Sequence, residues 1–409
     1  MSGTVTVIGG VNNGTLTGLV TIPAAGTPAQ ISALQSVLNF ASSAIESGST
    51  GMTNDNVVAG SVFNATLNGS SSNLLEITNS DSVNGTTSGS YSGPAINVAS
   101  VYGSVIVQAP GTVSVNGNGN NNSTYLFGSA SNVTLTTQDG TSGASIIAAG
   151  GNDVLNLRGN NTATITGGSD ITRTYTGSNT VFATGDASVY SGIRGGYAGK
   201  LDFINNSTAA ATVVGGAGSA TVFGGTGGGV FYGGTAGNNS LVGGTGNSTL
   251  VGGGNNDTLQ ATGAGSSNDL FAGSGNETLF ASSVTGTNIL VAAGGTDSLV
   301  GSGTGYQYFF GGTGSATMTG SANISVTGAK NIYFFGQAGG AGGGSDVITN
   351  FNTNSALFVT NGNDITTITG TTVNGINGAL VSLSDGTKVT LMGVNASSIS
   401  QYSGGKYIG

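Results

Sequence analysis

The chain has 409 residues, of which 78 are glycine, 4 are proline and 6% are charged, while 37% are hydrophobic. This balance argues against intrinsic disorder, which combines low hydrophobicity with high charge, and the net charge of −9 with seven basic residues excludes a basic surface for nucleic acids. The absence of cysteine and histidine excludes disulfides, thiolate and imidazole metal sites, and Ser-His-Asp or Cys-His catalysis. The richness in Gly, Ser, Thr, Asn and Val predicts strands joined by tight turns, an all-β fold.

Residues 1–50 are predicted to form two strands followed by a capping helix. TVTVIGG and TLTGLVTI alternate apolar and polar residues and predict a hairpin. In the following segment Thr27 is the predicted N-cap, Pro28 suits the first helical position, Gln30 completes a capping box and Gly48 ends the helix. The terminus lacks the basic and apolar regions of a secretory signal peptide, and the sequence has no apolar run long enough for a transmembrane helix.

Residues 51–212 are predicted to form irregular coils of a β-solenoid. The segment AAGGNDVLNL resembles AAGGTDSLVG at 292–301, which indicates distant copies of one repeat. The periodic phase is lost between about 180 and 212, which predicts an insertion or irregular coils there. The candidate strand centres upstream are Leu126, Leu135, Ile146, Leu155, Ile165 and Tyr175.

Residues 213–345 carry the clearest repeat. Apolar strand centres recur every nine to eleven residues, a period that marks a solenoid because stacked copies build one continuous core. Two consecutive copies make a coil of eighteen to twenty residues with one strand on each of two faces. The predicted centres are Val222, Phe231, Leu241, Leu250, Leu259, Leu270, Leu279, Leu290, Leu299, Phe309 and Met318.

Two sets of turn residues support this two-faced coil. Asp257, Glu277 and Asp297 are spaced by twenty residues and are predicted to stack on one side, one per coil. Ser248, Asn268 and Asn288 have the same spacing and are predicted to stack on the other side.

The copies GGTGNSTLV and GGGNNDTLQ resemble the Gly-Gly-x-Gly-x-Asp-x-Leu-x repeat of repeats-in-toxin (RTX) proteins. That resemblance implies a parallel β-roll with calcium in its turns. The first copy has Ser248 at the aspartate position, whereas the second keeps Asp257. The copies centred on Val222, Phe231 and Met318 have Ala220, Gly229 and Ala316 there and supply no carboxylate.

Residues 346–409 strengthen this likeness. GGSDVITNFNTNSALFV resembles the closing segment of such rolls, and GALVSLSDGTKVTLMGVNASSIS resembles the terminal β-hairpin of proteins exported by type I secretion. The resemblance implies an uncleaved C-terminal export signal and a secreted, extracellular or cell-surface protein.

Calcium is a candidate cofactor, with Asp257, Glu277 and Asp297 as ligands on one side and Asp269 as a further ligand on the other. The ion needs six to eight oxygens, and one carboxylate per coil serves at most two sites between adjacent coils. The alternative is that Asn and Ser side chains bond to the turns and replace the ion, since Asn stacks in ladders and tolerates the left-handed conformation.

The hypothesis that the protein is an enzyme rests on acidic and basic residues within 150–205. A paired-carboxylate site for polysaccharides is one interpretation of this set, and solvated turn residues or local ion pairs are the favoured alternative. The residues are Asp153, Asp170, Asp186, Asp202, Arg158, Arg173, Arg194 and Lys200. The aromatic runs YQYFF and IYFF place adjacent rings on opposite faces of a strand, so at least one ring of each pair is expected outside the roll. Filling of the core near the end of the roll is the favoured interpretation of these runs, and a protein-contact patch is the alternative.

Together these features favour a non-enzymatic secreted protein that assembles with copies of itself into a filament, surface layer or biofilm matrix. Sparse charge gives little repulsion between copies, and open strand edges, including the N-terminal strands, favour head-to-tail stacking. The alternatives are a monomeric adhesin for glycans or cell-surface polysaccharide and, less favoured, a polysaccharide-modifying enzyme.

Overall fold

The structure is a computed structural model. It describes residues 2–8, 11–12, 15–16, 19–25, 74–77, 95–98, 103–107, 111–117, 123–128, 131–138, 142–184, 186–191, 199–263, 265–283, 286–322, 331–336, 343–402 and 407–408. The described chain is almost entirely β and winds as a parallel β-solenoid of about 11 turns, which confirms the predicted fold class. The helix predicted between Thr27 and Gly48 lies outside the described residues.

The chain divides into two compact units, which comprise residues 1–190 with 204–208, and residues 191–203 with 209–409. In the first unit β1 (Ser2–Ile8) and β4 (Leu19–Ala25) form the predicted antiparallel hairpin, with β2 (Val11–Asn12) and β3 (Thr15–Leu16) between them. The second unit contains a short 3-10 helix, η1 (Ala396–Ser398).

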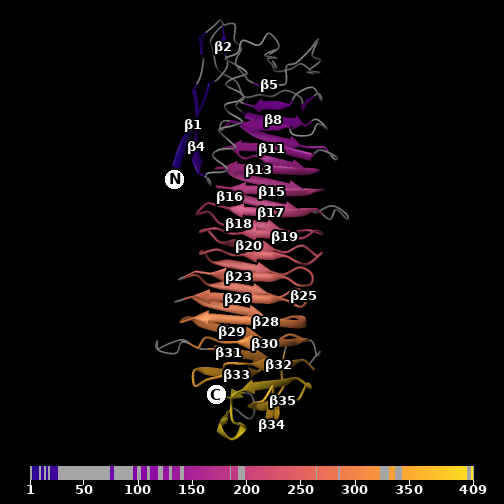
Figure 1. Ribbon diagram of the computed structural model, residues 1–409, viewed down its shortest axis with the longest axis vertical. Coiled ribbons are helices and arrows are strands. Elements are labelled where there is room, and N and C mark those ends of the chain that lie inside the picture. Colours follow the sequence, from indigo (N-terminus) through magenta and orange to yellow (C-terminus); the bar gives the residue numbers. More distant parts are fainter. Residues whose placement is uncertain are drawn as a thin grey trace. The chain divides into compact units, whose positions relative to one another are not determined.

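The solenoid of the first unit has two parallel sheets whose strands alternate along the chain (Figure 1). One sheet contains β5 (Leu74–Ile77), β7 (Ser104–Val107), β9 (Thr124–Phe127), β11 (Ser142–Ala149), β13 (Asn160–Thr166) and β15 (Ser178–Ala183). The other contains β6 (Ile96–Asn97), β8 (Gly111–Asn116), β10 (Ser131–Thr136), β12 (Val154–Leu157) and β14 (Ser169–Thr174). The strands β16 (Asp186–Ser191) and β17 (Lys200–Asn205) follow at the boundary between the units.

The second unit also has two parallel sheets, here named sheet A and sheet B. Sheet A contains β18 (Ala211–Val214), β20 (Gly229–Tyr232), β22 (Ser248–Val251), β24 (Asn268–Phe271), β27 (Thr287–Val291), β29 (Tyr306–Phe310), β31 (Asn331–Phe335) and β33 (Ser355–Val359). Sheet B contains β19 (Ala220–Phe223), β21 (Ser240–Val242), β23 (Thr258–Thr262), β26 (Thr278–Ser283), β28 (Gly294–Gly303), β30 (Ser315–Thr319) and β32 (Ser345–Ile348), with β25 (Ser274–Gly275) beside β28.

Antiparallel strands end both sheets of the second unit, and they include the predicted C-terminal hairpin. On sheet B, β36 (Lys388–Met392) continues parallel to β32, and β35 (Ile376–Leu383) and β34 (Ile365–Val373) follow antiparallel. On sheet A, β33 pairs with β38 (Tyr407–Ile408), which pairs with β37 (Gln401–Tyr402).

The core of the second unit matches the predicted repeat. All eleven predicted strand centres from Val222 to Met318 are fully buried between sheets A and B. The first unit corrects two positions. In β9 the inward side chains are Tyr125 and Phe127, one residue to either side of Leu126, and in β14 Thr172 takes the place in register with Leu155, ahead of Tyr175.

The tight turns require residues that tolerate a positive φ. Gly244 has φ of 79°, and a Cβ there would overlap the carbonyl oxygen of Gly225 in the preceding coil. Asn256 adopts the left-handed conformation with φ of 61° directly before Asp257. The Gly and Asn positions of the repeat therefore set the bends that bring each coil onto the next.

Candidate functional site: buried ladders and outer faces of the repeat

The acidic positions of the repeat form a ladder inside the second unit, at the start of the sheet B strands. Strand register places Asp257, Glu277 and Asp297 on successive coils, as their spacing predicts. Their exposed fractions are 1%, 1% and 3%, so these side chains point into the roll and are not solvated turn residues. We call this set, extended by the equally buried Asp346, the carboxylate ladder.

Asp257 and Asp297 are held by backbone N–H groups. Asp257 Oδ2 accepts from Gly253 N at 2.7 Å, and its Oδ1 accepts from the backbone and side-chain nitrogens of Asn239 at 2.8 and 2.9 Å. Asp297 accepts from Ala293 N at 2.9 Å within its own turn and from Glu277 N at 3.1 Å on the preceding coil. Each carboxylate thus ties its own turn to a neighbouring coil.

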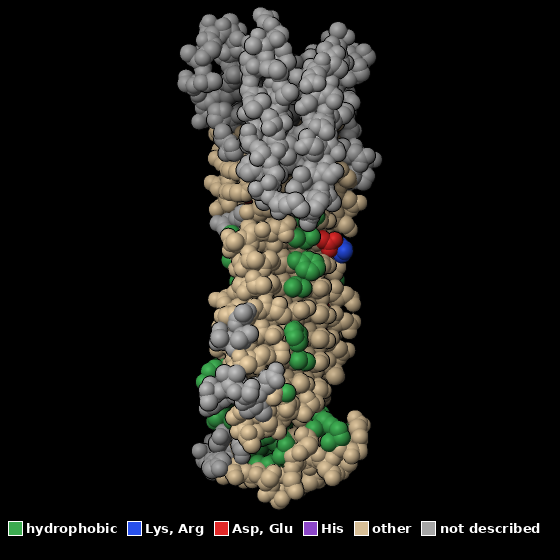
Figure 2. Space-filling model, turned by 60° about the vertical axis from the view of Figure 1, so that its left-hand side comes forward, with side chains coloured by type: hydrophobic (Ala, Val, Ile, Leu, Met, Phe, Trp, Pro, Cys, Tyr) green, Lys and Arg blue, Asp and Glu red, His purple; other side chains and the backbone are tan. Residues whose placement is uncertain are grey.

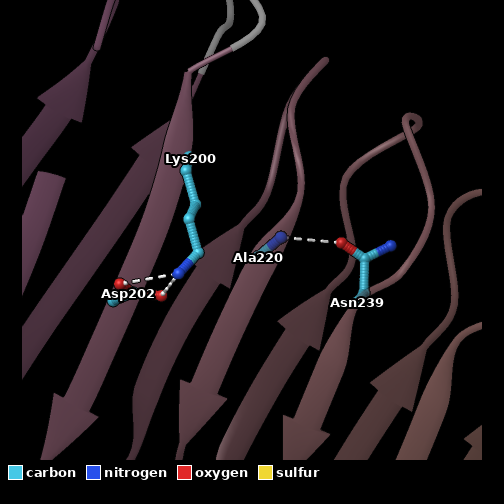
Figure 3. Close-up of polar contacts among 4 residues, drawn as sticks. All are labelled: Lys200, Asp202, Ala220 and Asn239. Carbon is cyan, nitrogen blue, oxygen red and sulfur yellow. Dashed lines mark hydrogen bonds and ion pairs between the residues drawn. The ribbon is translucent and has the colours of Figure 1, made fainter. Parts of the chain in front are cut away.

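Asn239 continues the same position one coil upstream of Asp257. Its Oδ1 accepts from Ala220 N at 2.8 Å, a contact drawn in Figure 3, and from Gly234 N at 2.9 Å. An amide therefore takes the acceptor role of the aspartates at this coil, and it also donates to Asp257.

Glu277 lies between two carboxylates with no donor for its own. Neither of its carboxylate oxygens has a hydrogen-bond partner among the described residues. Burial, followed by the carboxylates of Asp297 and Asp257, raises the pKa of Glu277 to about 8. Glu277 therefore keeps its proton at neutral pH, because an acid placed between two acids in a buried position ionises only at a high cost in free energy.

Asp346 is a second carboxyl group of this ladder with an incomplete set of partners. Its Oδ1 accepts from Ala316 N at 2.8 Å, whereas its Oδ2 has no partner among the described residues. Burial, with a smaller contribution from the charge of Asp297, raises the pKa of Asp346 to about 7.

A second ladder, which we call the amide ladder, lies at the start of the sheet A strands. Register stacks Ser248, Asn268, Asn288, Gln307 and Asn331 on successive coils, and all five are buried. Asn268 Nδ2 donates to Asn288 Oδ1 at 3.0 Å, and Asn288 Nδ2 donates to Gln307 Oε1 at 3.0 Å. An amide both donates and accepts, so it bonds directly to the next coil.

The ends of the amide ladder bond to turn carbonyls, as the sequence alternative to calcium requires. Ser248 Oγ donates to Gly243 O at 2.9 Å, and Gln307 Nε2 donates to Ser302 O at 3.1 Å. Asn331 Nδ2 donates to Ser321 O at 3.1 Å.

Asp269 does not join the other candidate calcium ligands. It lies on sheet A with its side chain outward and half-buried, and burial raises its pKa. The described residues contain no cluster of three or more His, Cys, Asp or Glu side chains that could hold a metal ion. At Asp257 and Asp297 the carboxylate oxygens accept N–H donors, and calcium binding stays a prediction.

The candidate catalytic set of residues 150–205 is dispersed. Asp153 and Asp170 are 0% and 2% exposed, which corrects their reading as solvated turn residues. Asp153 accepts from Val133 N at 2.7 Å and Asp170 accepts from Asp153 N at 2.8 Å, while burial raises their pKa values to about 6 and 7. They repeat the carboxylate arrangement of the second unit, inside the roll.

The cations of this set that the structure describes, Lys200, Arg158 and Arg173, lie on the surface. Lys200 forms an ion pair with Asp202 at 3.1 Å, the local pair that the sequence favours (Figure 3). Arg158 lies over the ring of Tyr175 at 5.3 Å, Arg173 is half-buried on the outer face of β14, and the side chains of Asp186 and Arg194 lie outside the described residues.

The outer surface of residues 204–363 carries almost no charge among the residues that the structure describes. Residues 204–363 contain Asp257, Asp269, Glu277, Asp297, Lys330 and Asp346 as their charged residues. Four of these are the buried carboxylates of the ladder, and Lys330 lies outside the described residues. Asp269 is thus the one outward charged side chain of this stretch within the described residues.

The outer face of sheet A has one column of side chains that is apolar along its whole length. One outward position carries an apolar side chain on each of eight successive coils, and we call this set the sheet A row. Phe310 and Phe334 stack at 4.8 Å between ring centroids, and Phe334 and Phe358 stack at 5.5 Å. The row is Val214, Tyr232, Val251, Phe271, Val291, Phe310, Phe334 and Phe358.

The outer face of sheet B has a different chemistry. One outward position carries a hydroxyl side chain on six successive coils: Thr221, Ser240, Thr258, Thr278, Ser298 and Thr317. The adjacent position is mixed, with Phe223, Val242, Gln260, Phe280 and Val300. Figure 2 shows hydrophobic side chains in a broken column on one face of the molecule, with one acidic and one basic side chain beside the column.

Comparison of the chain with protein-family models, with curated proteins and with solved structures finds no match. No helix of the described residues is long and apolar enough to cross a membrane.

Proposed function

We propose that the chain is a secreted, non-enzymatic structural protein that assembles with copies of itself into an extracellular filament, surface layer or biofilm matrix. The observation that carries this proposal is the charge-poor exterior of the second unit, where Asp269 is the one outward charge between residues 204 and 363 within the described residues. Surfaces without charge offer little electrostatic repulsion between copies, and regular strands supply long contact surfaces.

The internal ladders support the same role. The residues of the carboxylate ladder and the amide ladder form hydrogen bonds to neighbouring coils inside the roll. Such residues stabilise a long, uniform body, and they leave the outer faces free for contacts. Export by type I secretion, calcium in the turns and head-to-tail stacking through the N-terminal strands belong to the proposal as implied by the repeats-in-toxin resemblance and by the sequence.

The test is sedimentation velocity and electron microscopy of the purified full-length chain over a range of concentrations, with calcium and with a chelator. The proposal expects large assemblies in at least one of these two conditions. A chain that stays monomeric at high concentration in both would overturn it.

A surface-binding adhesin is the second candidate, favoured by the outer face of sheet B. Its hydroxyl column lies beside Phe223 and Phe280, and hydroxyl groups next to apolar rings suit the polar edges and apolar faces of sugars. This candidate expects the monomer to bind insoluble polysaccharides in pull-down assays, with binding lost in Phe223→Ser/Phe280→Ser. A wild-type monomer that binds none of them would exclude it.

A further inference from the structure

We propose that the outer face of sheet A is the self-association surface, and that it packs against the same face of a second copy of the chain. This inference rests on the proposed function, because it names the surface through which the assembly forms. It concerns sheet A of the second unit alone and is independent of head-to-tail stacking.

The first argument is the contrast between the two outer faces of one roll. Both sheets are built by the same repeat, and the outward position after each core residue is apolar on all eight coils of sheet A. On sheet B the same position is interrupted by Gln260 and Thr319, and the outward position before each core residue carries hydroxyl groups on six successive coils. The other outward position on sheet A is mixed, with Thr212, Val230, Thr249, Asp269, Ile289, Tyr308, Ile332 and Ala356 on the same eight coils. A continuous apolar row of this kind marks an interaction surface, since single exposed apolar residues are common and long rows are not.

The second argument is the area of the face. Eight strands spaced ~4.8 Å apart and about five residues long give roughly 600 Å² per copy. Two such faces together bury about 1,200 Å², the lower end of the range for a specific, stable interface between proteins. The sheet A face is therefore large enough for a dimer without help from another surface.

The third argument is the kind of partner that fits. The face is a regular ladder without positive charge among its described residues, so it offers nothing to an acidic polymer or to phosphate headgroups. Two faces related by a two-fold axis present identical rows to each other, and sheets that pack face to face bring their side chains together about 10 Å apart. A second copy of the chain therefore presents an apolar row of the same length and spacing.

The charge of Asp269 is expected to weaken the proposed interface. It lies on the fourth of the eight coils, one outward position from Phe271 and next to Ile289 in register. Face-to-face packing about the middle of the row brings this carboxylate against apolar side chains of the second copy, and burying an unpaired charge opposes association. The interface should therefore strengthen when the charge is removed.

The test uses the full-length chain and three variants. Phe310→Ser/Phe334→Ser removes two outward rings of the sheet A row, and Phe223→Ser/Phe280→Ser is the matched control on sheet B. We expect the first variant to raise the dissociation constant measured by sedimentation at least about tenfold and the control to leave it within about twofold, because anchoring aromatic residues dominate interfaces. We expect Asp269→Asn to lower it, and circular dichroism checks that every variant is folded.

The absence of cysteine allows a second readout. Val291→Cys near the middle of the sheet A row should give a disulfide-linked dimer on oxidation, whereas Val300→Cys on sheet B should not. Assembly that persists unchanged in Phe310→Ser/Phe334→Ser, or cross-linking through Val300→Cys alone, would overturn this interface and leave the proposed function standing. A wild-type chain that never associates would overturn both.

Discussion

The two buried ladders of the second unit occupy equivalent positions of one repeat but are bonded differently. On the sheet A side, Asn268, Asn288 and Gln307 bond side chain to side chain from coil to coil. On the sheet B side, Asp257 and Asp297 accept backbone N–H groups, and Glu277 between them has no donor for either oxygen. The difference follows from the chemistry of the groups, since an amide donates and accepts whereas a carboxylate only accepts.

The comparison shows what each ladder demands of its surroundings. The amide ladder bonds from coil to coil through Asn268, Asn288 and Gln307 and carries no charge at any pH, although Asn268 Oδ1 has no partner among the described residues. The carboxylate ladder depends on the N–H groups of the turns and on a proton at Glu277. Burial is the main cause that raises the pKa of Glu277 to about 8, so this proton is released near that pH. One roll therefore has a side that is insensitive to pH and a side that is sensitive to it.

The largest effect is expected from placing a carboxylate in the amide ladder. Asn288→Asp keeps the acceptor for Asn268 but sets a buried anion against Gln307 Oε1, and we expect a loss of about 3–5 kcal/mol in the free energy of unfolding at pH 7. Urea denaturation measures it. Thr249→Asp, which puts the same charge on the outer face of sheet A, is the control, and equal losses in the two variants would contradict the ladder.

A smaller loss is expected from placing an amide in the carboxylate ladder. Asp297→Asn leaves one acceptor oxygen for the two backbone N–H donors of Glu277 and Ala293. We expect a loss of about 1 kcal/mol, the usual net value of one hydrogen bond, in urea denaturation at pH 6, where Glu277 is protonated. A gain in stability at that pH would show that the two N–H contacts contribute nothing.

The smallest effect is expected outside both ladders. Asp269→Asn changes the one outward carboxylate between residues 204 and 363 of the described chain, and we expect the free energy of unfolding of the monomer to change by less than about 0.5 kcal/mol. The same denaturation assay at a low protein concentration measures it. A change as large as that of Asp297→Asn would indicate a structural role for Asp269.

Much of this architecture could be predicted from the sequence because the repeat is strict. The period of the apolar residues placed all eleven centres of the second unit in the core, and the spacing of twenty residues placed Asp257, Glu277 and Asp297 on one side. Both depend on counting along the chain, and a solenoid converts a count directly into a position in space.

The inward direction of the acidic side chains could not be predicted in the same way. A turn aspartate is ordinarily solvated, and only the structure shows that Asp257, directly before β23, has its side chain inside the roll. The same limit explains the first unit, where Thr172 and Thr174 fill the interior of β14 and no apolar residue marks the strand centre. Period analysis follows apolar residues and misses coils whose core is built from threonine.

The proton at Glu277 is tested most directly by the stability of the wild type and of Glu277→Gln as a function of pH. The folded pKa of about 8 lies above the ordinary value of 4.5, so the folded state binds the extra proton and stability falls as pH rises between these values. Buried carboxyls with pKa values near 6 and 7, those of Asp153, Asp170 and Asp346, add to this fall, mainly below about pH 7. Between pH 7 and 8 we expect the wild type to lose about 1 kcal/mol more than Glu277→Gln, whose remaining loss comes from Asp170 and Asp346. Parallel curves for the two proteins across that interval would contradict a proton held in the carboxylate ladder.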